Sequence, residues 1–389
     1  MYGNLGPVEP NTFKERCKHA SRAVAAGEKK SAGWLLAAYP AISSNPFLEM
    51  LYSASVENGF GCVRMKKLAQ AAKLPRKTRT IIHLHWVHRA FGASGNIASM
   101  SARDAKKSVD GFLKGLRREQ DAGRQIMWTV HNIMSHSAAF PEEERELRAG
   151  VAEIADHIHI MNPKTVSLCA PLYALPKNKI FEVAHPSYLG IYEDTLSRDE
   201  ARRELRLSLE DKVFLIFGRL GAYKGTERFL GQIDHLQNRV GGKAKLIIAG
   251  SGMEPAVEQG LRPLAEGRSD VMLDTSYVDD AHVQRYFRAA DVVVCGQKAG
   301  LNSGVAHTAA SFGCPVVVSQ NLVPSLGGAE NFVFPFEAEN PASIVDASIA
   351  ALQASAAPDR AQLLAEWARE RAPNVMSKRF FEKLRARLS

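Results

Sequence analysis

The sequence predicts an α/β fold with two doubly wound, Rossmann-like domains facing a cleft. Short apolar runs alternate with amphipathic helical stretches along the chain, which is typical of βαβ units and parallel sheets. A length of 389 residues is too great for one ordinary core and suits two domains. The composition, 46% hydrophobic and 23% charged, is that of a globular protein.

The N-terminal domain is expected over residues 1–186. Apolar runs predict its strands, at Gly33–Tyr39, Thr80–Trp86, Gln125–Val130, His157–Met161 and Lys179–Ala184. Amphipathic stretches predict helices from Phe47, over Ala105–Glu119 and over Glu142–Ala155.

The C-terminal domain is expected over residues 187–357, after a pause in the pattern at His185-Pro186. It opens with a helix at Arg198–Leu205. Its predicted strands are Val213–Phe217, Ala244–Ala249, Val271–Asp274, Val292–Cys295, Pro315–Ser319 and Asn331–Phe334. Residues 358–389 form a helical segment, interrupted at Pro373, that we expect to pack back toward the N-terminal domain.

Charge and cysteine usage narrow the class of protein. Residues 1–100 hold 14 Lys/Arg against 5 Asp/Glu, which equals the net charge of +9 of the whole chain. The basic stretch from Arg64 to Arg79 could be simply a solvated basic face, which is the usual role of a charge run, or it could meet an anionic membrane surface or an acidic substrate. Without a nucleic-acid motif, nucleic acid ranks last. Five widely spaced cysteines without a CxxC pair indicate a reducing compartment and no structural zinc site. No signal peptide or membrane-spanning run is recognisable, so we expect a cytoplasmic protein, at most peripheral on the inner face of the membrane.

The segment from Phe214 to Gly225 carries the strongest chemical signal. A buried strand runs into Gly218, where a backbone without Cβ can approach a ligand closely. Arg219 offers a planar fork of donors and Lys224 a mobile point charge, both near the start of the next helix. The combination predicts a diphosphate site. Solvated charges at a helix-capping turn would explain one of these cations, but not the whole pattern.

Later turns repeat the placement of glycine after a strand. Gly250 and Gly252 follow the next strand, and the loop Gly296–Gly304 leads into a helix that ends in Gly313-Cys314-Pro315-Val-Val-Val. The order GR(x)nKG, then GxG, then a Gly-rich loop and G-x-P-V-V resembles the C-terminal half of the GT-B glycosyltransferases, especially family 4. The resemblance covers residues 125–350 and is strongest over 214–319.

The resemblance implies roles for individual positions. Arg219 and Lys224 match the basic pair that holds the diphosphate of the sugar donor, and His131 matches a histidine near the donor sugar. The segment Tyr277, Val278 and Asp279 resembles the one along the nucleotide base. Asn302, Ser303 and Gly304 lie where backbone amides of the family meet phosphate and sugar.

One departure bears on mechanism. Retaining members carry two glutamates, with seven residues between them, at positions that are Gly300 and Thr308 here. Thr308 stays a predicted donor-site position, but both carboxylates are missing. The Asn-Ser-Gly replacement is similar to bacterial exopolysaccharide β-mannosyltransferase-like enzymes, so inversion is slightly favoured over retention. An inverting enzyme needs a general base, commonly a carboxylate or a histidine.

Histidines of the first domain are the candidates for that base. His83 and His85 alternate on one face of their predicted strand. A zinc site formed with His88 is conceivable but disfavoured, because strand spacing alone rarely supplies zinc ligands. We single out His131 and His85 as catalytic candidates, while Asp104 has only its location to support it.

The sequence therefore predicts a metal-independent hexosyltransferase that uses a GDP- or UDP-sugar as co-substrate and needs no cofactor. Its acceptor would be a hydroxyl of a glycan or a lipid-linked oligosaccharide, in polysaccharide or glycolipid synthesis. Two alternatives stay open: a non-catalytic nucleotide-sugar-binding partner subunit, and a sugar-nucleotide epimerase on the same fold.

Overall fold

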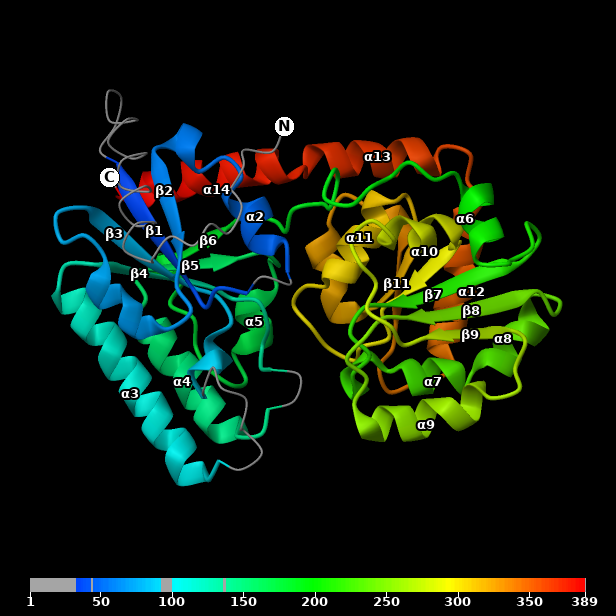
Figure 1. Cartoon of the computed structure of the whole chain (residues 1–389), viewed down its shortest axis with the longest axis horizontal. Helices are drawn as coiled ribbons and strands as arrows, with labels where there is room; N and C mark the ends of the chain where they lie inside the picture. Colours follow the sequence, from blue (N-terminus) through cyan, green and yellow to red (C-terminus); the bar gives the residue numbers. More distant parts are fainter. Residues whose placement is uncertain (1–32, 43–44, 92–99, 136–137, 389) are drawn as a thin grey trace. The chain divides into compact units, whose positions relative to one another are not determined.

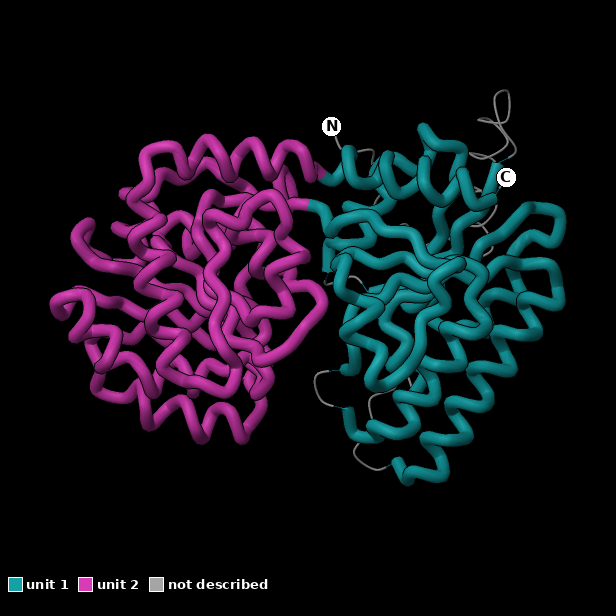
Figure 2. The backbone as a smooth tube through the Cα atoms, turned by 180° about the vertical axis from the view of Figure 1, so that it is seen from behind, with its two compact units in different colours: residues 1–186, 373–389 teal, residues 187–372 magenta. Residues whose placement is uncertain are grey.

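The computed structural model describes residues 33–42, 45–91, 100–135 and 138–388. The chain divides into two compact units (Figure 2). Unit 1 comprises residues 1–186 together with 373–389, and unit 2 comprises residues 187–372. The helical stretch that the sequence places at 358–389 is thus shared, because α13 (Arg360–Glu370) belongs to unit 2 and α14 (Pro373–Leu388) to unit 1.

Unit 1 is built on a parallel sheet of six strands in the order β2-β1-β3-β4-β5-β6. In chain order the strands are β1 (Trp34–Tyr39), β2 (Phe60–Arg64), β3 (Arg79–Leu84), β4 (Gln125–Thr129), β5 (His157–Ile160) and β6 (Ile180–Glu182). The order steps outward from β1 in both directions, which is the doubly wound arrangement expected from the sequence.

Helices cover both faces of this sheet (Figure 1). The long helices α3 (Ala102–Asp121) and α4 (Pro141–Ile154) pack together on one face, and α2 (Phe47–Tyr52) packs with α14 on the other. Ser377 of α14 is buried and donates to the Leu51 carbonyl at 2.7 Å. The end of the chain thereby completes the core of unit 1. The short helix α5 (Thr165–Cys169) follows β5.

Unit 2 has a second parallel sheet of six strands, ordered β12-β11-β10-β7-β8-β9. Its strands are β7 (Lys212–Phe217), β8 (Ala244–Ala249), β9 (Val271–Asp274), β10 (Val292–Val294), β11 (Val316–Ser319) and β12 (Val333–Phe336). Its helices, besides α13, are α6 (Arg198–Glu204), α7 (Thr226–Leu230), α8 (Ile233–Arg239), α9 (Pro255–Ala265), α10 (Val283–Ala289), α11 (Gly304–Ser311) and α12 (Ser343–Ser355).

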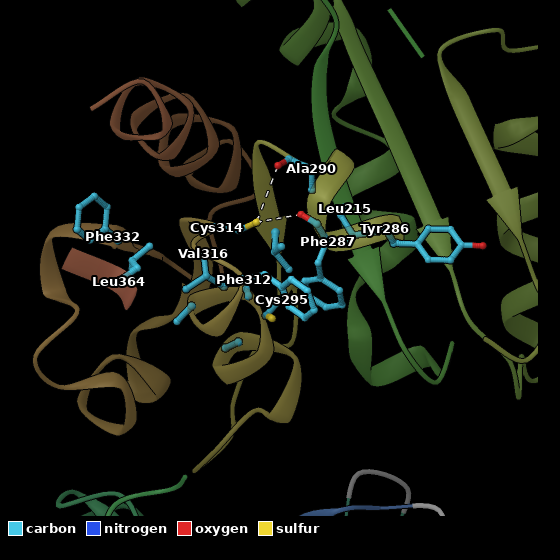
Figure 3. Packing of buried hydrophobic residues seen from close by; sticks show 14 of the residues in the cluster. Leu215, Tyr286, Phe287, Ala290, Cys295, Phe312, Cys314, Val316, Phe332 and Leu364 are labelled. Atoms are coloured by element: carbon cyan, nitrogen blue, oxygen red, sulfur yellow. Dashed lines mark hydrogen bonds between the residues drawn. The ribbon is translucent and has the colours of Figure 1, made fainter. Parts of the chain in front are cut away.

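Alternation along the strands of unit 2 gives two separate cores. On β7, Val213 and Leu215 face one core and Phe214 and Ile216 face the other. Figure 3 shows the first core, where Cys314 lies buried and donates to the Phe287 carbonyl at 3.2 Å. Burial raises the pKa of this thiol to about 12. Cys295 and Cys314 are both small residues of this core.

Most predicted elements appear within two residues of their expected ends, and the differences have local causes. The sequence missed β2, which is short, includes Gly61 and follows the left-handed Gly59. The strand predicted at Thr80–Trp86 ends at Leu84, so His88 lies in a separate 3-10 turn at Val87–Phe91. Of the helices in the described ranges, none is long and apolar enough to cross a bilayer.

Candidate functional site

The turns after β7 and β8 cross at a pair of glycines. Gly218 has a φ of +90° and donates its N–H to the Ala249 carbonyl at 2.9 Å. Gly250 has a φ of +141°, and a Cβ built on it would lie 2.1 Å from the Gly218 carbonyl oxygen. Both predicted glycines are therefore required for the two turns to approach each other.

Arg219 follows this crossing and is exposed. A Cβ on Gly252 would lie 3.4 Å from Cγ of Arg219, so the second glycine of the predicted GxG borders the arginine stem. Across the described ranges the guanidinium has no hydrogen bond or ion pair, in contrast to the twelve arginines there that form ion pairs. Its fork of donors is available to an anionic ligand.

Lys224 differs from Arg219 because it is buried, with 6% of its surface exposed. Its Nζ donates to the Phe217 carbonyl at 2.9 Å, the single hydrogen-bond acceptor that the described residues offer it. Burial lowers the pKa of this ammonium. A Cβ on Gly218 would lie 3.7 Å from Nζ. The ammonium thus faces the space that Gly218 leaves open, and two of its three protons stay available.

The start of α11 lies beside the same turn. A Cβ on Gly218 would come within 3.5 Å of Val305 Cγ2, in the first turn of α11. The loop after β10 is held here as well, because a Cβ on Gly225 would lie 2.4 Å from the Gly296 carbonyl oxygen. The structure therefore brings the predicted Arg219/Lys224 turn and the 296–304 loop together.

Four predicted positions on this loop and helix have distinct environments. Ser303 caps α11 and accepts from the Ala306 N–H at 3.3 Å, while Thr308 donates back to the Gly304 carbonyl at 2.8 Å. A Cβ on Gly304 would lie 2.7 Å from the Tyr188 hydroxyl. Both polar side-chain atoms of Asn302 are buried without a hydrogen-bond partner in the described structure. Ser303 and Thr308 are accordingly satisfied locally, whereas Asn302 is not.

A hollow of about 390 Å³ adjoins the turn. Its lining includes Tyr223, Thr226, Arg228 and Lys298. Arg228 donates to the Ala338 carbonyl at 3.1 Å, and the hydroxyl of Thr226 is buried without a partner in the described part of the chain. These residues were not predicted from the sequence. Thr226 could have been identified as a site residue because it directly follows the Lys224-Gly225 motif.

The predicted base-side segment lies at the surface. Tyr277 is 72% exposed and Val278 is half-buried. Asp279 is exposed and accepts a hydrogen bond from the His282 ring at 2.8 Å. These residues follow β9, so they lie at the carboxyl edge of the same sheet as Gly218 and Gly250.

The predicted histidines are in unit 1, where they form a hydrogen-bonded chain. His83 and His85 share a face, as predicted, with ring centroids 4.0 Å apart. Tyr52 Oη contacts His83 Nδ1 at 2.7 Å and His85 Nε2 at 2.8 Å, and His85 Nδ1 contacts His131 Nε2 at 3.0 Å. His85 is buried with both ring nitrogens occupied, so its position supports an action through His131 rather than direct contact with a substrate.

The loop after β4, which carries His131, is anchored by residues that the sequence analysis missed. Buried Arg148 donates to the Asn132 carbonyl at 2.8 Å and pairs with Glu144 at 2.6 Å. Tyr173 donates to the Ile133 carbonyl at 2.8 Å. Burial opposes ionisation of Glu144, but Arg148 and Ser135 outweigh it and lower the pKa of this carboxyl.

Two further expectations concern Asp104 and metal ions. Asp104 is exposed in the first turn of α3, where its carboxylate accepts from Ser101 Oγ at 2.7 Å, which lowers its pKa together with Lys107. That is the environment of a helix-capping residue. Of the residues with described positions, no three His, Cys, Asp or Glu side chains are grouped to hold a metal ion. His136, which is five positions after His131 and is a further histidine candidate of the first domain, lies outside the described residues.

Residues 211–354, within unit 2, match the family model described as glycosyl transferases group 1. No curated protein matches the chain. Similar solved structures include Anabaena HepE in complex with UDP-glucose, with a TM-score of 0.62 at 14% identity over 91% of this chain and 99% of that chain.

Two other similar structures are phosphosugar synthases. Sucrose-phosphate synthase from Thermosynechococcus elongatus has a TM-score of 0.62 at 13% identity, over 91% of this chain and 99% of that chain. An α,α-trehalose-phosphate synthase from Burkholderia xenovorans, with glucose-6-phosphate, has a TM-score of 0.58 at 12% identity, over 90% and 100%. The resemblance that the motifs indicated is confirmed: residues 211–354 match the group 1 glycosyltransferase family model, and the chain has the GT-B fold of two Rossmann-like domains.

Proposed function

We propose that the protein transfers a hexose from a nucleotide-diphosphate sugar to a hydroxyl group. The observation that carries this proposal is the pair of cations in a group 1 glycosyltransferase domain, Arg219 unpaired at the surface and Lys224 aimed at Gly218. Negative charge grows on the departing diphosphate during transfer, and preorganised cations stabilise that charge. Arg219 and Lys224 supply two, so this step needs no metal ion in the proposed mechanism.

The sugar donor is proposed to be a UDP- or GDP-sugar. Anabaena HepE, which shares the fold at 14% identity, was solved with UDP-glucose, and this makes UDP-glucose the first compound to test. Exposed Tyr277 with Val278 and Asp279 is the segment proposed to lie along the base. Asn302, with its unpartnered amide, and the backbone at Ser303-Gly304 are proposed to meet the phosphate and the sugar.

The stereochemistry is proposed to be inverting. The family's two glutamate positions are Gly300 and Thr308, and a Cβ on Gly300 would already lie 3.3 Å from Leu322. The Thr308 hydroxyl is engaged by its own helix. Neither position offers a carboxylate to the sugar, and the half-buried His131 is the candidate for the base.

The acceptor is proposed to be a glycan or a lipid-linked oligosaccharide, in polysaccharide or glycolipid synthesis. Support comes from an exposed cationic surface of unit 1, formed by Lys66, Lys67, Lys73, Arg76 and Lys77. None of these five has an ion pair with a described residue. Such a surface attracts anionic lipid heads at about 1 kcal/mol per cation. A peripheral position on the cytoplasmic side of the membrane follows from this proposal.

A thermal-shift screen of UDP-, GDP- and ADP-sugars tests the donor assignment. A ligand that binds only the folded protein raises its apparent stability. One donor class should raise the Tm of the wild type, and the shift should vanish in Arg219→Ala with the ligand-free Tm unchanged. Arg203→Ala, which alters another exposed arginine of unit 2, is the matched control. If no sugar nucleotide shifts the Tm, the proposal fails.

The missing glutamates also favour a second candidate, a non-catalytic sugar-nucleotide-binding subunit. Such a protein would bind the donor through Arg219 and Lys224 but release no nucleoside diphosphate with any glycan or glycolipid acceptor. Release of diphosphate that disappears in Arg219→Ala distinguishes the enzyme from it. An epimerase would instead convert the donor without an acceptor, which chromatography of the sugar nucleotide reveals.

A further inference from the structure

Six buried or half-buried side chains of unit 1 are joined in one line of hydrogen bonds. The line begins at His131, continues through His85, Tyr52, His83, Thr129 and His159, and ends on the Val183 carbonyl. Its further contacts are His83 Nε2 to Thr129 Oγ1 at 2.7 Å, Thr129 Oγ1 to His159 Nδ1 at 3.0 Å, and His159 Nε2 to Val183 O at 3.1 Å. Every member except His131 is buried.

The carbonyl at the end fixes the direction of every bond in the line. A carbonyl oxygen can only accept, so His159 must carry its proton on Nε2 and present a bare Nδ1 to Thr129. The Thr129 hydroxyl then donates to His159 and accepts from His83 Nε2. By the same rule the Tyr52 hydroxyl donates to His83 Nδ1 and accepts from His85 Nε2.

The last step assigns the protons of His131. His85 carries its proton on Nε2, so its Nδ1 accepts, and His131 must donate from Nε2. A neutral His131 therefore has a bare Nδ1. This atom has no hydrogen-bond partner within the described ranges, and it is not one of the buried unpartnered atoms there. The line thus ends in an accessible acceptor.

The assignment requires neutral rings, and their surroundings supply that condition. Burial lowers the pKa of His83, His85 and His131 well below the ordinary value, with neighbouring histidines adding to the effect. The pKa of His159 is lowered to about 4 by burial, although its hydrogen bond to the Val183 carbonyl raises it in part. The His131 ring is held by Trp86, stacked at 4.5 Å, and by the edge of Phe47 at 4.9 Å.

We propose that this line is a positioning relay, which holds His131 in its Nε2–H form so that Nδ1 receives the hydrogen bond of a sugar hydroxyl. His131 is the residue that touches the substrate, and Tyr52, His83, His85, Thr129 and His159 act through it. The use of a sugar hydroxyl rests on the proposed function; the proton assignment does not.

The direct test is ¹⁵N NMR of histidine-labelled, ligand-free, full-length protein at pH 7.5, because the ring nitrogens of each tautomer differ in shift. Signals are assigned by their loss in single His→Gln variants. All four relay histidines should be in the Nε2–H form. An Nδ1–H or doubly protonated His131 would overturn the assignment, and this outcome is independent of any sugar nucleotide.

Thr129→Val tests the relay from a distance with an isosteric change. Without the hydroxyl, a proton on Nε2 of His83 would be a buried donor with no acceptor. This costs more free energy than an unprotonated Nε2 at the same place. We expect the bonds from His83 to His131 to reverse, so that His131 carries its proton on Nδ1. Tyr52→Phe should give the same switch at His131, which guards against a folding defect in either variant. An unchanged His131 spectrum in both contradicts the relay.

Ser377→Ala is the matched control, since it removes a buried hydroxyl that contacts Leu51 and Ala54 on either side of Tyr52 but lies outside the line. In turnover of UDP-glucose, Thr129→Val should lower kcat at least tenfold with the donor KM changed less than about threefold, and Ser377→Ala should leave both unchanged. General acid–base groups contribute 10²–10⁴-fold, so a partial loss is expected. A wild-type rate in a variant with a switched His131 would refute the substrate role of Nδ1. Absence of wild-type turnover would count against the proposed function and leave the proton assignment to the NMR result.

Discussion

At the scale of single residues, Gly250 determines whether the candidate site can form. Its missing side chain lets the turn after β8 lie against the Gly218 carbonyl, where a Cβ would come within 2.1 Å. The neighbouring atom is backbone and cannot move aside like a flexible side chain. Gly250 therefore links the stability of unit 2 to the geometry beside Arg219.

Gly250→Ala should destabilise unit 2 by more than about 3 kcal/mol, because the overlap adds to the 1–3 kcal/mol of a strained backbone. Gly267→Ala is the control: its φ is also positive, at +72°, but a Cβ there would meet nothing within 4 Å. Urea unfolding followed by the fluorescence of Trp367, the single tryptophan of unit 2, measures both. Equal losses in the two variants would contradict the role of the crossing.

Lys224 is a second residue whose environment favours function over stability. Its buried ammonium has one hydrogen-bond acceptor in the described structure, so its desolvation is poorly compensated. Even a buried ion pair can often be replaced by hydrophobic residues of similar volume with a neutral effect or a stabilisation of about 1–4 kcal/mol, and the charge of Lys224 has no counter-ion among the described residues. Lys224, whose ammonium carries this desolvation cost, is also the residue that faces the proposed diphosphate site.

Lys224→Met should leave the free energy of unfolding unchanged or raise it by about 1 kcal/mol, while the Tm shift caused by the sugar nucleotide is lost. Arg202→Met is the contrast, since buried Arg202 pairs with Asp291 at 2.8 Å and also donates to four carbonyls. That variant should lose 3–5 kcal/mol. A large loss in Lys224→Met would show that the lysine is structural.

At the scale of elements, three adjacent strands supply the interior of unit 1 with polar side chains. β3 carries His83, β4 carries Thr129 and β5 carries His159, and Thr129 and His159 are register partners. The sheet therefore keeps several neutral imidazoles in its core, and their protonation is linked to folding.

The free energy of unfolding of unit 1 should fall as the pH drops from about 6.5 toward 5. Each relay histidine has a folded pKa below its unfolded value of about 6.5, so the unfolded chain binds more protons in this window. The slope is up to about 1.4 kcal/mol per pH unit for each histidine, and stability is fully present above about pH 7. The measurement is urea unfolding at each pH of the Trp367→Phe variant, whose remaining tryptophans are all in unit 1, so that its fluorescence reports the unfolding of that unit. Stability that is flat between pH 5 and 7.5, where carboxylates stay ionised, would contradict the prediction.

The sequence predicts those features that depend on residues close together in the chain, and misses those that depend on contacts between distant residues. β8 and β9 have the predicted bounds because each is a mostly apolar run that gives way to glycine or polar residues at its end. The cations of the Arg219–Lys224 turn were recognisable from a stretch of twelve residues. The relay was not, because its hydrogen bonds join residues 24 to 46 positions apart and can be inferred only once the strand order is known. His159 was seen only as part of an apolar run.

At the scale of the whole molecule, the two units have separate cores, and unit 1 is assembled from both ends of the described chain. Phe380 and Phe381 of α14 are fully buried. The ring centroid of Phe381 lies 4.7 Å from that of Phe60 of β2, and the ring centroid of Phe380 lies 5.0 Å from that of His159 of β5. α14 is therefore a part of the first sheet's covering rather than an appendage of the second unit.

Phe381→Ala should destabilise unit 1 by about 3–5 kcal/mol and leave unit 2 unaffected. Phe229→Ala, a buried phenylalanine of α7, should do the reverse. Unfolding is followed by tryptophan fluorescence in two sets of variants, one that keeps only Trp367 and one that keeps only the three tryptophans of unit 1. Destabilisation of unit 2 by Phe381→Ala would contradict the division.

The position of α14 has a consequence for biosynthesis. The strands of unit 1 leave the ribosome first, but Phe60, Tyr52 and His159 lack their α14 partners until the last described helix has been made. About 200 residues, from 187 to 388, are added after Pro186 before that helix is complete, which takes about 10–40 s at a translation rate of 5–20 residues per second. Unit 2 is contiguous and ends at residue 372, so all of its residues have been made when the synthesis of α14 begins. We therefore expect the two units to complete their folds in the reverse of the order in which their synthesis begins, unit 2 before unit 1.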